Sequence, residues 1–169
     1  VNEKTLIVAL SQSGETMDTL MAVRHAREQG AKVISICNTH GSTLPRESDA
    51  ALYTHAGPEI AVASTKAFLA QITAAYLLGL YLAQLRGNKY KDEIASILAE
   101  LQNMPAKIQK VIDNDTQVKE LGVEMKDASS VIFLGRHVGF PVAMEGALKL
   151  KEITYIHAEG FAAGELKHG

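Results

Sequence analysis

Three hydroxyl side chains and one glycine are concentrated in the six residues SQSGET, positions 11–16. They follow a continuous apolar run of strand length and precede a segment with helical spacing of apolar residues. In an open parallel sheet such a loop lies beyond the carboxyl end of a strand, where backbone N–H groups and the helix dipole favour an anion. Gly14 lets the backbone come close, while Ser11, Ser13 and Thr16 offer neutral donors. The pattern predicts a phosphate site, and the alternative is that Ser13 merely caps the following helix.

A second hydroxyl pair, Ser64-Thr65, also lies where a predicted loop enters a helix. A helix cap explains this pair when it is taken alone, whereas two such loops in one α/β domain favour a shared phosphate. The sequence contains no GxxxxGK[ST] motif, and no GxGxxG motif follows a predicted strand. Nucleotide sites of the Walker type and dinucleotide sites of the Rossmann type are therefore unsupported.

Residues 141–155 predict a helix with three ionisable side chains on one face. Glu145, Lys149 and Glu152 are spaced i, i+4 and i+7, which aligns them along the helix. The other positions are so apolar that we expect the helix to be buried and the charged stripe to form a polar seam. Two interpretations stay open, a solvated Glu–Lys pair and a set of groups for proton transfer. A predicted glycine-broken loop follows, and its ionisable residues favour the second interpretation: Glu159, Glu165, Lys167 and His168.

The elements that must hold these residues alternate between strands and helices. Apolar runs predict strands at residues 5–10, 32–37, 50–54 and 130–135. Helical spacing predicts helices at residues 16–29, 67–85, 90–114, 116–125 and 141–155. This alternation predicts an α/β fold with doubly wound parallel sheets between layers of helices. The composition changes near residue 88 and divides the chain into two α/β pieces, residues 1–88 and 89–169.

Composition argues against several other classes of protein. The net charge is −2, aromatic residues make up 5% and Trp is absent, so neither nucleic acid nor an acidic membrane surface is an expected partner. The 6 histidines form no HxxxH or HExxH pair, which argues against a metal site. Cys37 stands alone in a predicted strand and fits a buried thiol in a reducing cytoplasm. No signal-peptide pattern is visible at the start of the sequence.

The long apolar run at residues 67–85 has the length of a membrane span. It is interrupted by Gln71, Thr73 and Gln84. Lys66 and Arg86 flank it without a clear charge bias. Because the rest of the chain has the pattern of a soluble α/β protein, we expect a helix buried inside a domain or a subunit interface.

Three segments together resemble one family: SQSGET at residue 11, VASTKAF at residue 62, and EGALKLKEITYIHAEGFAAGELKHG from residue 145 onward. They are similar to the sugar-isomerase (SIS) region of the glucosamine-6-phosphate synthase family, the glutamine–fructose-6-phosphate aminotransferases. The similarity covers essentially the whole chain, although SQSGET alone marks the wider SIS superfamily. The resemblance implies two SIS subdomains, each with a parallel sheet between helices. It also implies a homodimer, a cytoplasmic location and no cofactor.

The resemblance further implies which residues bind the substrate. The family's reaction converts fructose 6-phosphate and glutamine-derived ammonia to glucosamine 6-phosphate. Residues of the first loop match the positions that hold the sugar phosphate, and residues of the second loop match a sugar contact made partly through the backbone. In this sequence these positions are Ser11, Gln12, Ser13 and Thr16 for the phosphate, and Ser64 with the Val62 backbone for the sugar.

Catalytic roles are implied in the same way. Glu152 matches the base that moves a proton between C1 and C2 and so converts a ketose imine to an aldose amine. Lys149 and Glu145 match its neighbours in proton handling. His168 matches the ring-opening histidine, which in the family reaches a neighbouring subunit's site.

Relative to the family, the sequence lacks the glutaminase domain, the first strand with its Gly-Thr-Ser loop, and the C-terminal tail with its Schiff-base lysine. We therefore expect a fragment of a longer chain that is inactive by itself. Two other functions stay open. A non-catalytic SIS module that senses a phosphosugar needs the hydroxyl loop but not Glu152. A deglycase or deaminase acting on amine-linked sugar phosphates would keep both sites.

Overall fold

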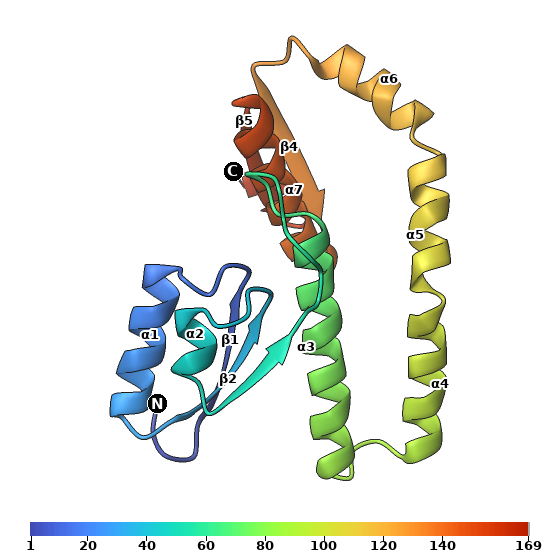
Figure 1. Ribbon diagram of the computed structural model, residues 1–169. Coiled ribbons are helices and arrows are strands. Elements are labelled where there is room, and N and C mark those ends of the chain that lie inside the picture. Colours follow the sequence, from blue (N-terminus) through green and yellow to red (C-terminus); the bar gives the residue numbers. More distant parts are fainter. Residues whose placement is uncertain (169) are drawn as a thin grey trace. The chain divides into compact units, whose positions relative to one another are not determined.

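The computed structural model of the chain describes residues 1–168 and consists of two compact units (Figure 1). Unit 1 spans Val1–Ile97, and unit 2 begins at Leu98. Each unit contains its own parallel sheet, as the alternation of strands and helices predicted. The boundary expected near residue 88 lies in the loop between the helices at Lys66–Leu85 and Lys91–Gln102, and it stays a prediction.

Unit 1 contains a three-stranded parallel sheet in the order β1-β2-β3. Its strands are β1 (Leu6–Ser11), β2 (Lys32–Cys37) and β3 (Ala50–Tyr53). Its helices are α1 (Met17–Glu28), the short α2 (Thr43–Arg46) and α3 (Lys66–Leu85). The predicted strands and long helices of this unit are confirmed to within one residue at each end. Helix α2 was not predicted, because 4 residues are too few to show a helical period.

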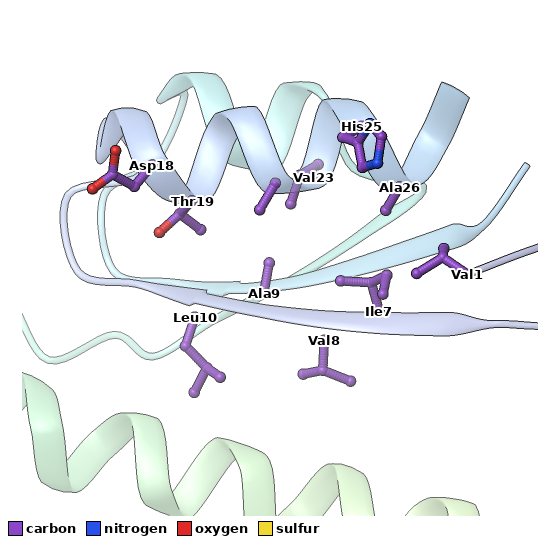
Figure 2. A pocket seen from close by; sticks show the side chains of 11 residues that line it. Val1, Ile7, Val8, Ala9, Leu10, Asp18, Thr19, Val23, His25 and Ala26 are labelled. Carbon is purple, nitrogen blue, oxygen red and sulfur yellow. The ribbon is translucent and has the colours of Figure 1, made fainter. Parts of the chain in front are cut away.

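The alternation of side chains along β1 decides what this sheet buries. Ala9 points toward α1, where it joins Leu20 and Val23 of that helix in the core (Figure 2). Val8 and Leu10 point to the opposite face and remain 37% and 45% exposed. Helix α3 lies on that opposite side and contacts β2. The sheet of unit 1 therefore has helices on both faces, with its buried core under α1.

One polar network holds the carboxyl ends of the three strands together. The N–H groups of Asn38 and Thr39, directly after β2, donate to Gln12 O in the loop after β1, at 3.3 and 3.2 Å. The Asn38 Oδ1 accepts from Thr54 Oγ1 at 2.8 Å and from Ala56 N at 3.0 Å, just after β3. Loops from three strands thereby meet at one edge, which is where ligands bind in open parallel sheets.

Helix α3 is less buried than the sequence predicted. Ala67 and Leu80 are its buried residues, whereas Tyr76 and Leu85 are 50% and 64% exposed. Burial inside a domain is therefore wrong for unit 1, because its short sheet covers one side of a 20-residue helix. An interface with other polypeptide stays a prediction. By length and composition α3 also meets the criterion for a membrane span, alone among the helices of residues 1–168, but core helices of globular proteins meet the same criterion.

Helices α4 (Lys91–Gln102), α5 (Met104–Asp113) and α6 (Thr116–Met125) follow, and α4 crosses the boundary between the units. The sequence predicted a single helix over residues 90–114, and this prediction is wrong. The helix is interrupted at Asn103, because Pro105 in the first turn of α5 has no N–H to bond the carbonyl of Leu101 in α4.

Unit 2 contains a sheet of two parallel strands, β4 (Ser130–Gly135) and β5 (His157–Ala162), followed by a short 3-10 helix at Leu166–His168. The sequence predicted a glycine-broken loop in place of β5, which is wrong. Small residues give β5 a low strand propensity, so its structure depends on pairing with β4 and packing against the next helix. That packing is close: a Cβ on Gly160 would lie 2.8 Å from the Met144 Cα.

Helix α7 (Gly139–Thr154) covers this sheet and begins two residues before the predicted start. Ala143 and Ala147 are buried, whereas Val142 and Ile153 are 62% and 65% exposed. The expectation that the whole helix is buried is therefore wrong for unit 2 by itself. The covered face is the one toward β4 and β5, and small alanine side chains let the helix approach the strands.

Candidate functional site

The hydroxyls of residues 11–16 are organised by the backbone of their own loop. Ser11 Oγ is buried, accepts from Gly14 N at 2.9 Å and lies 3.3 Å from Thr16 Oγ1. Ser13 Oγ accepts from Glu15 N at 3.2 Å. Because Ser13 Oγ acts as an acceptor for a backbone N–H group, its own O–H group remains able to donate to a further acceptor. Of the Ser11 and Thr16 hydroxyls, one donates to the other, so one O–H group of this pair also remains for a ligand. The loop therefore presents hydroxyl donors at the carboxyl end of β1, as an anion site requires.

The competing interpretation of Ser13 as a helix cap is wrong. Helix α1 begins at Met17 with Thr16 in the N-cap position, and no side-chain cap bond is formed there. Ser13 lies three residues earlier and bonds within the loop. The Thr16 hydroxyl faces Ser11 instead of the first turn of α1. Neither hydroxyl is used up by capping the helix.

Gly14 is required by the shape of this loop. Its φ is +71°, in the left-handed region that glycine adopts without a steric cost. A Cβ at this position would lie 2.0 Å from Ser42 Oγ and 2.9 Å from Cys37 Sγ, both buried beneath the loop. Gly14 O also accepts from Leu44 N at 2.9 Å. The loop is thus seated on the segment between β2 and α2, and the buried thiol expected at Cys37 is part of its support.

Glu15 has a role that the sequence did not reveal. Its carboxylate accepts from Thr43 N, the first residue of α2, at 2.8 Å. This backbone hydrogen bond lowers the pKa of Glu15, so the group is charged beside the hydroxyl loop. A negative charge next to an anion site opposes anion binding, and the α2 amide holds the carboxylate by a hydrogen bond without removing its charge. The four-residue length of α2 hid this contact from the sequence.

Helix α3, which follows the second hydroxyl loop, is capped by a residue other than the predicted Ser64 or Thr65. The N-cap residue of α3 is Thr65, without a side-chain cap bond. Glu59 instead accepts from Ala67 N at 2.9 Å and contacts Thr65 Oγ1 at 3.4 Å. Ser64 is half-buried and takes no part in this cap, while Val62 is 92% exposed. The backbone at Val62 and the Ser64 hydroxyl are accordingly accessible to a ligand.

The acid–base residues of α7 meet as their spacing predicted. Lys149 Nζ lies 2.6 Å from Glu152 Oε2 and 3.5 Å from Glu145 Oε1. The three side chains are 22–30% exposed, so they are neither free in solvent nor sealed from it. One ammonium between two carboxylates leaves a net negative charge, which is what a proton acceptor on this face needs. We call Glu145, Lys149 and Glu152 the acid–base cluster.

The charge of Lys149 is stabilised by its partners. The hydrogen bond to Glu152 is the main cause that raises the pKa of Lys149, and partial burial acts in the opposite direction. Lys149 is therefore an ammonium at neutral pH and works as a hydrogen-bond donor that fixes the Glu152 carboxylate. This arrangement holds a carboxylate in a defined orientation, which a general base requires.

The remaining ionisable residues of the C-terminal segment lie apart from this cluster. His168 is exposed in the 3-10 helix, where its N–H donates to Glu165 O at 2.9 Å. Glu159 is on β5 and pairs with His157 at 3.3 Å on the exposed surface. Within residues 1–168 no hydrogen bond or ion pair joins either residue to the acid–base cluster. The phosphate loop belongs to unit 1 and the cluster to unit 2.

A hollow of about 610 Å³ lies beneath α1 along β1, and it is a different kind of site (Figure 2). Its lining is mainly apolar, with Ile7 and Ala9 of β1 facing Val23 and Ala26 of α1. It contains none of the hydroxyls of residues 11–16. Because β1 is an edge strand of this sheet, the hollow runs along a strand whose outer side is unpaired. It does not lie at the carboxyl ends of the strands, where the ligand is expected.

Comparison with known proteins identifies the family. The SIS domain family matches residues 1–81 and 124–169, which include both hydroxyl loops and the acid–base cluster. The chain belongs to the SIS domain family. The predicted fold class is thereby confirmed as the α/β fold of this family, with parallel sheets and helix layers.

Individual SIS proteins are similar over the whole chain. A "Glutamine--fructose-6-phosphate aminotransferase [isomerizing]" of Corynebacterium efficiens is 82% identical over 169 residues, all of this chain and 27% of that protein. The protein of the same name in Streptomyces coelicolor is 63% identical and is covered to 28%. The C-terminal domain of glucosamine-fructose-6-phosphate aminotransferase from Francisella tularensis has a TM-score of 0.94 at 46% identity, over 97% of this chain and 47% of that one. The chain thus spans little more than a quarter of the curated relatives it matches.

Proposed function

We propose that this chain is the isomerase part of a glutamine–fructose-6-phosphate aminotransferase. The observation that carries the proposal is the 82% identity to a protein of that name, which extends over all 169 residues and so includes both candidate sites. This level of identity supports assigning the hydroxyl loop and the acid–base cluster to the same reaction. The proposed reaction converts fructose 6-phosphate, with ammonia from glutamine, to glucosamine 6-phosphate.

The hydroxyl loop is the proposed phosphate site. Hydroxyl and backbone donors around Gly14 surround the position beyond the carboxyl end of β1 where an anion is favoured. The loop before α3 is the proposed contact to the sugar itself. The residues assigned to these two tasks are Ser11, Gln12, Ser13 and Thr16 for the phosphate, and Ser64 with the Val62 backbone for the sugar.

The acid–base cluster is the proposed site of proton transfer. In the ketose imine, the Glu152 carboxylate removes a proton from C1 while the imine nitrogen gains a proton, which leaves a C1–C2 double bond and an amine on C2. The protonated carboxyl then returns its proton to C2 while the C1 hydroxyl loses its proton, which gives the aldose amine. Lys149 holds the carboxylate through the 2.6 Å contact, and Glu145 shares the ammonium from the other side. Neither a metal ion nor an organic cofactor enters this scheme. A sensor module needs no such cluster, which favours an enzyme.

Further parts of the proposal concern the assembly. His168 opens the sugar ring, acting in the site of a second copy of the chain, and the protein is a cytoplasmic homodimer. A glutaminase domain upstream supplies ammonia, and a lysine beyond this segment forms the Schiff base with the sugar. The relatives' greater length leaves room for both, because this chain covers 27% of the Corynebacterium efficiens protein.

The test is to measure glucosamine 6-phosphate formation from fructose 6-phosphate and glutamine by the whole protein as the organism makes it. Formation that needs both substrates supports the proposal. Release of ammonia from glucosamine 6-phosphate, without synthesis in the presence of glutamine, would instead assign a deaminase. Binding of the sugar phosphate with no turnover in either direction would assign a sensor.

A further inference from the structure

Three aromatic side chains form a cluster at the carboxyl edge of the unit 1 sheet, and the proposed chemistry uses none of them. His40 stacks on Tyr53, with ring centroids 3.9 Å apart and an interplanar angle of 17°. His55 lies 5.4 Å from His40 and 6.5 Å from Tyr53. His40 and His55 are exposed, so both imidazoles can exchange protons with solvent. We call these three residues the histidine cluster.

The histidine cluster is tied to the proposed phosphate loop by the backbone. His40 directly follows Thr39, whose N–H and hydroxyl both donate to Gln12 O, at 3.2 and 3.3 Å. His55 lies between Thr54 and Ala56, which both donate to Asn38 Oδ1. The two histidines therefore extend from the same network that holds the loops of β1, β2 and β3 together at the ligand-binding edge.

The phosphate loop itself supplies no positive charge. Its donors are hydroxyls, and the charged Glu15 lies beside them. A sugar phosphate carries up to two negative charges near neutral pH, so a cation near the loop would strengthen its binding. Histidine changes its charge between about pH 5 and 8 and can provide that cation conditionally.

Charged groups on the elements next to the cluster include two cations and two carboxylates. Arg46 of α2 donates to Gly41 O, next to His40, at 2.6 Å. Lys66, at the start of α3, lies near Gly57, with its Nζ 4.0 Å from where a Cβ would stand. Glu15 bonds the α2 amide, and Glu59 bonds the first turn of α3. Each carboxylate is thus engaged by the backbone of a helix.

We propose that His40 and His55 form a proton-dependent cationic rim for the phosphate loop, which strengthens sugar-phosphate binding when either imidazole is protonated. The inference rests on the proposed sugar-phosphate function. Tyr53 holds the His40 ring in place and remains a suitable partner after protonation, because the face of an aromatic ring attracts a cation.

The experiment compares fructose 6-phosphate binding by calorimetry in the whole protein as it occurs and in the double variant His40→Asn/His55→Asn. Asn tolerates the left-handed φ of 52° at position 55. The matched control is His25→Asn, because His25 is an exposed histidine near the end of α1. The substrate's phosphate also titrates in this range, but it does so equally in each protein, so the ratio of affinities removes its contribution.

The wild-type to double-variant affinity ratio is expected to be about threefold larger at pH 6 than at pH 8, the scale of one partly screened charge. The difference should disappear at about 1 M salt, which shortens the screening length to about 3 Å, whereas a purely structural role would not respond to salt. His55→Lys, with a permanent charge, should keep tight binding at pH 8. An affinity ratio that does not change with pH overturns the inference. Absence of fructose 6-phosphate binding by the wild type at every pH would instead overturn the proposed function.

Discussion

At the scale of single residues, the two candidate sites depend on oxygen atoms whose other partners the structure identifies. Ser11 and Ser13 accept backbone N–H groups, so Ser13 and one member of the Ser11–Thr16 pair keep a hydroxyl hydrogen for a ligand. Glu152 is held by Lys149, so its carboxylate is fixed before a substrate arrives. In both sites the local bonds orient the functional atom before a ligand binds. The loss of side-chain entropy on binding or catalysis is therefore smaller.

Replacing Ser13 by alanine should weaken sugar-phosphate binding. The change removes one hydrogen bond to a charged group, so the expected loss is about 1–2 kcal/mol, or roughly 5- to 30-fold in affinity. Calorimetric titration with fructose 6-phosphate measures it. Ser130→Ala, at the amino end of β4 in the other unit, is the control and should leave the affinity unchanged. Unchanged affinity in Ser13→Ala would remove Ser13 from the phosphate site.

Replacing Glu152 by glutamine should abolish proton transfer and spare binding. Gln keeps the shape and the hydrogen-bonding capacity of the side chain but cannot accept the proton, so turnover should fall by at least roughly 10²-fold, the scale of losing a general base. Affinity for the sugar phosphate should change little. Exchange of solvent deuterium into the transferred position is the direct assay, made on the whole protein.

Glu159→Gln is the matched control for that experiment, because Glu159 pairs with His157 outside the acid–base cluster. Its exchange rate should resemble that of the wild type. If Glu152→Gln also exchanged like the wild type, another group would be the base, and Glu145, which shares the same ammonium, would be the next to replace.

At the scale of elements, the junction between β1 and α1 is the part of the fold on which phosphate binding depends. Gly14 closes onto the segment before α2, and Glu15 bonds the first amide of α2. The turn is therefore fixed from two sides by a helix that the sequence did not predict. The junction between β4 and α7 is comparably tight, since a Cβ on Gly135 would lie 2.0 Å from Gly139 O.

Gly14→Ala should destabilise the protein more than Gly41→Ala, although both glycines have a φ of 71°. The backbone cost for alanine is about 1 kcal/mol at either position. A methyl group at Gly41 would meet no other atom within 4 Å, whereas a methyl group at Gly14 would meet Ser42 and Cys37, which should add about 1–3 kcal/mol of overpacking. Denaturant unfolding compares the two variants. Equal losses of stability would show that the loop moves aside without cost.

At the scale of the whole molecule, much apolar surface is uncovered in each unit considered by itself. In unit 1 this surface runs along the open edge of β1 and along α3, where Tyr76 and Leu85 are at least half exposed. In unit 2 the outer side of β4 leaves Ile132 and Leu134 55% and 49% exposed. Surfaces of this kind normally pack against other polypeptide. The relatives, which are far longer than this chain, offer such polypeptide.

Residues 1–169 produced by themselves should therefore associate and show no synthase turnover. Unpaired strand edges and exposed apolar helices favour association, and the glutaminase domain and Schiff-base lysine expected in the family lie outside this segment. Sedimentation velocity measures the first property, and glucosamine 6-phosphate formation measures the second. The whole protein is the positive control. Robust synthesis by this segment alone would refute the expectation.

The sequence by itself determined the local features of this protein. Apolar runs of strand length located β1, β2 and β4, because strands of parallel sheets are rich in apolar side chains. The i, i+4, i+7 spacing placed Glu145, Lys149 and Glu152 on one helix face, because helical geometry fixes that relation without any tertiary contact. The grouping of hydroxyls around Gly14 located the candidate phosphate loop, because these residues are neighbours in the sequence and need no distant contact to lie together.

Only the tertiary structure decided the features that depend on partners distant in the sequence. Strand β5 exists because β4 and α7 provide its contacts, since its own small residues do not favour a strand. Glu15 and Glu59 act as helix caps across 28 and 8 residues, distances over which no sequence pattern operates. The histidine cluster likewise joins the loop after β2 to the end of β3, and parallel pairing of those strands brings its rings together.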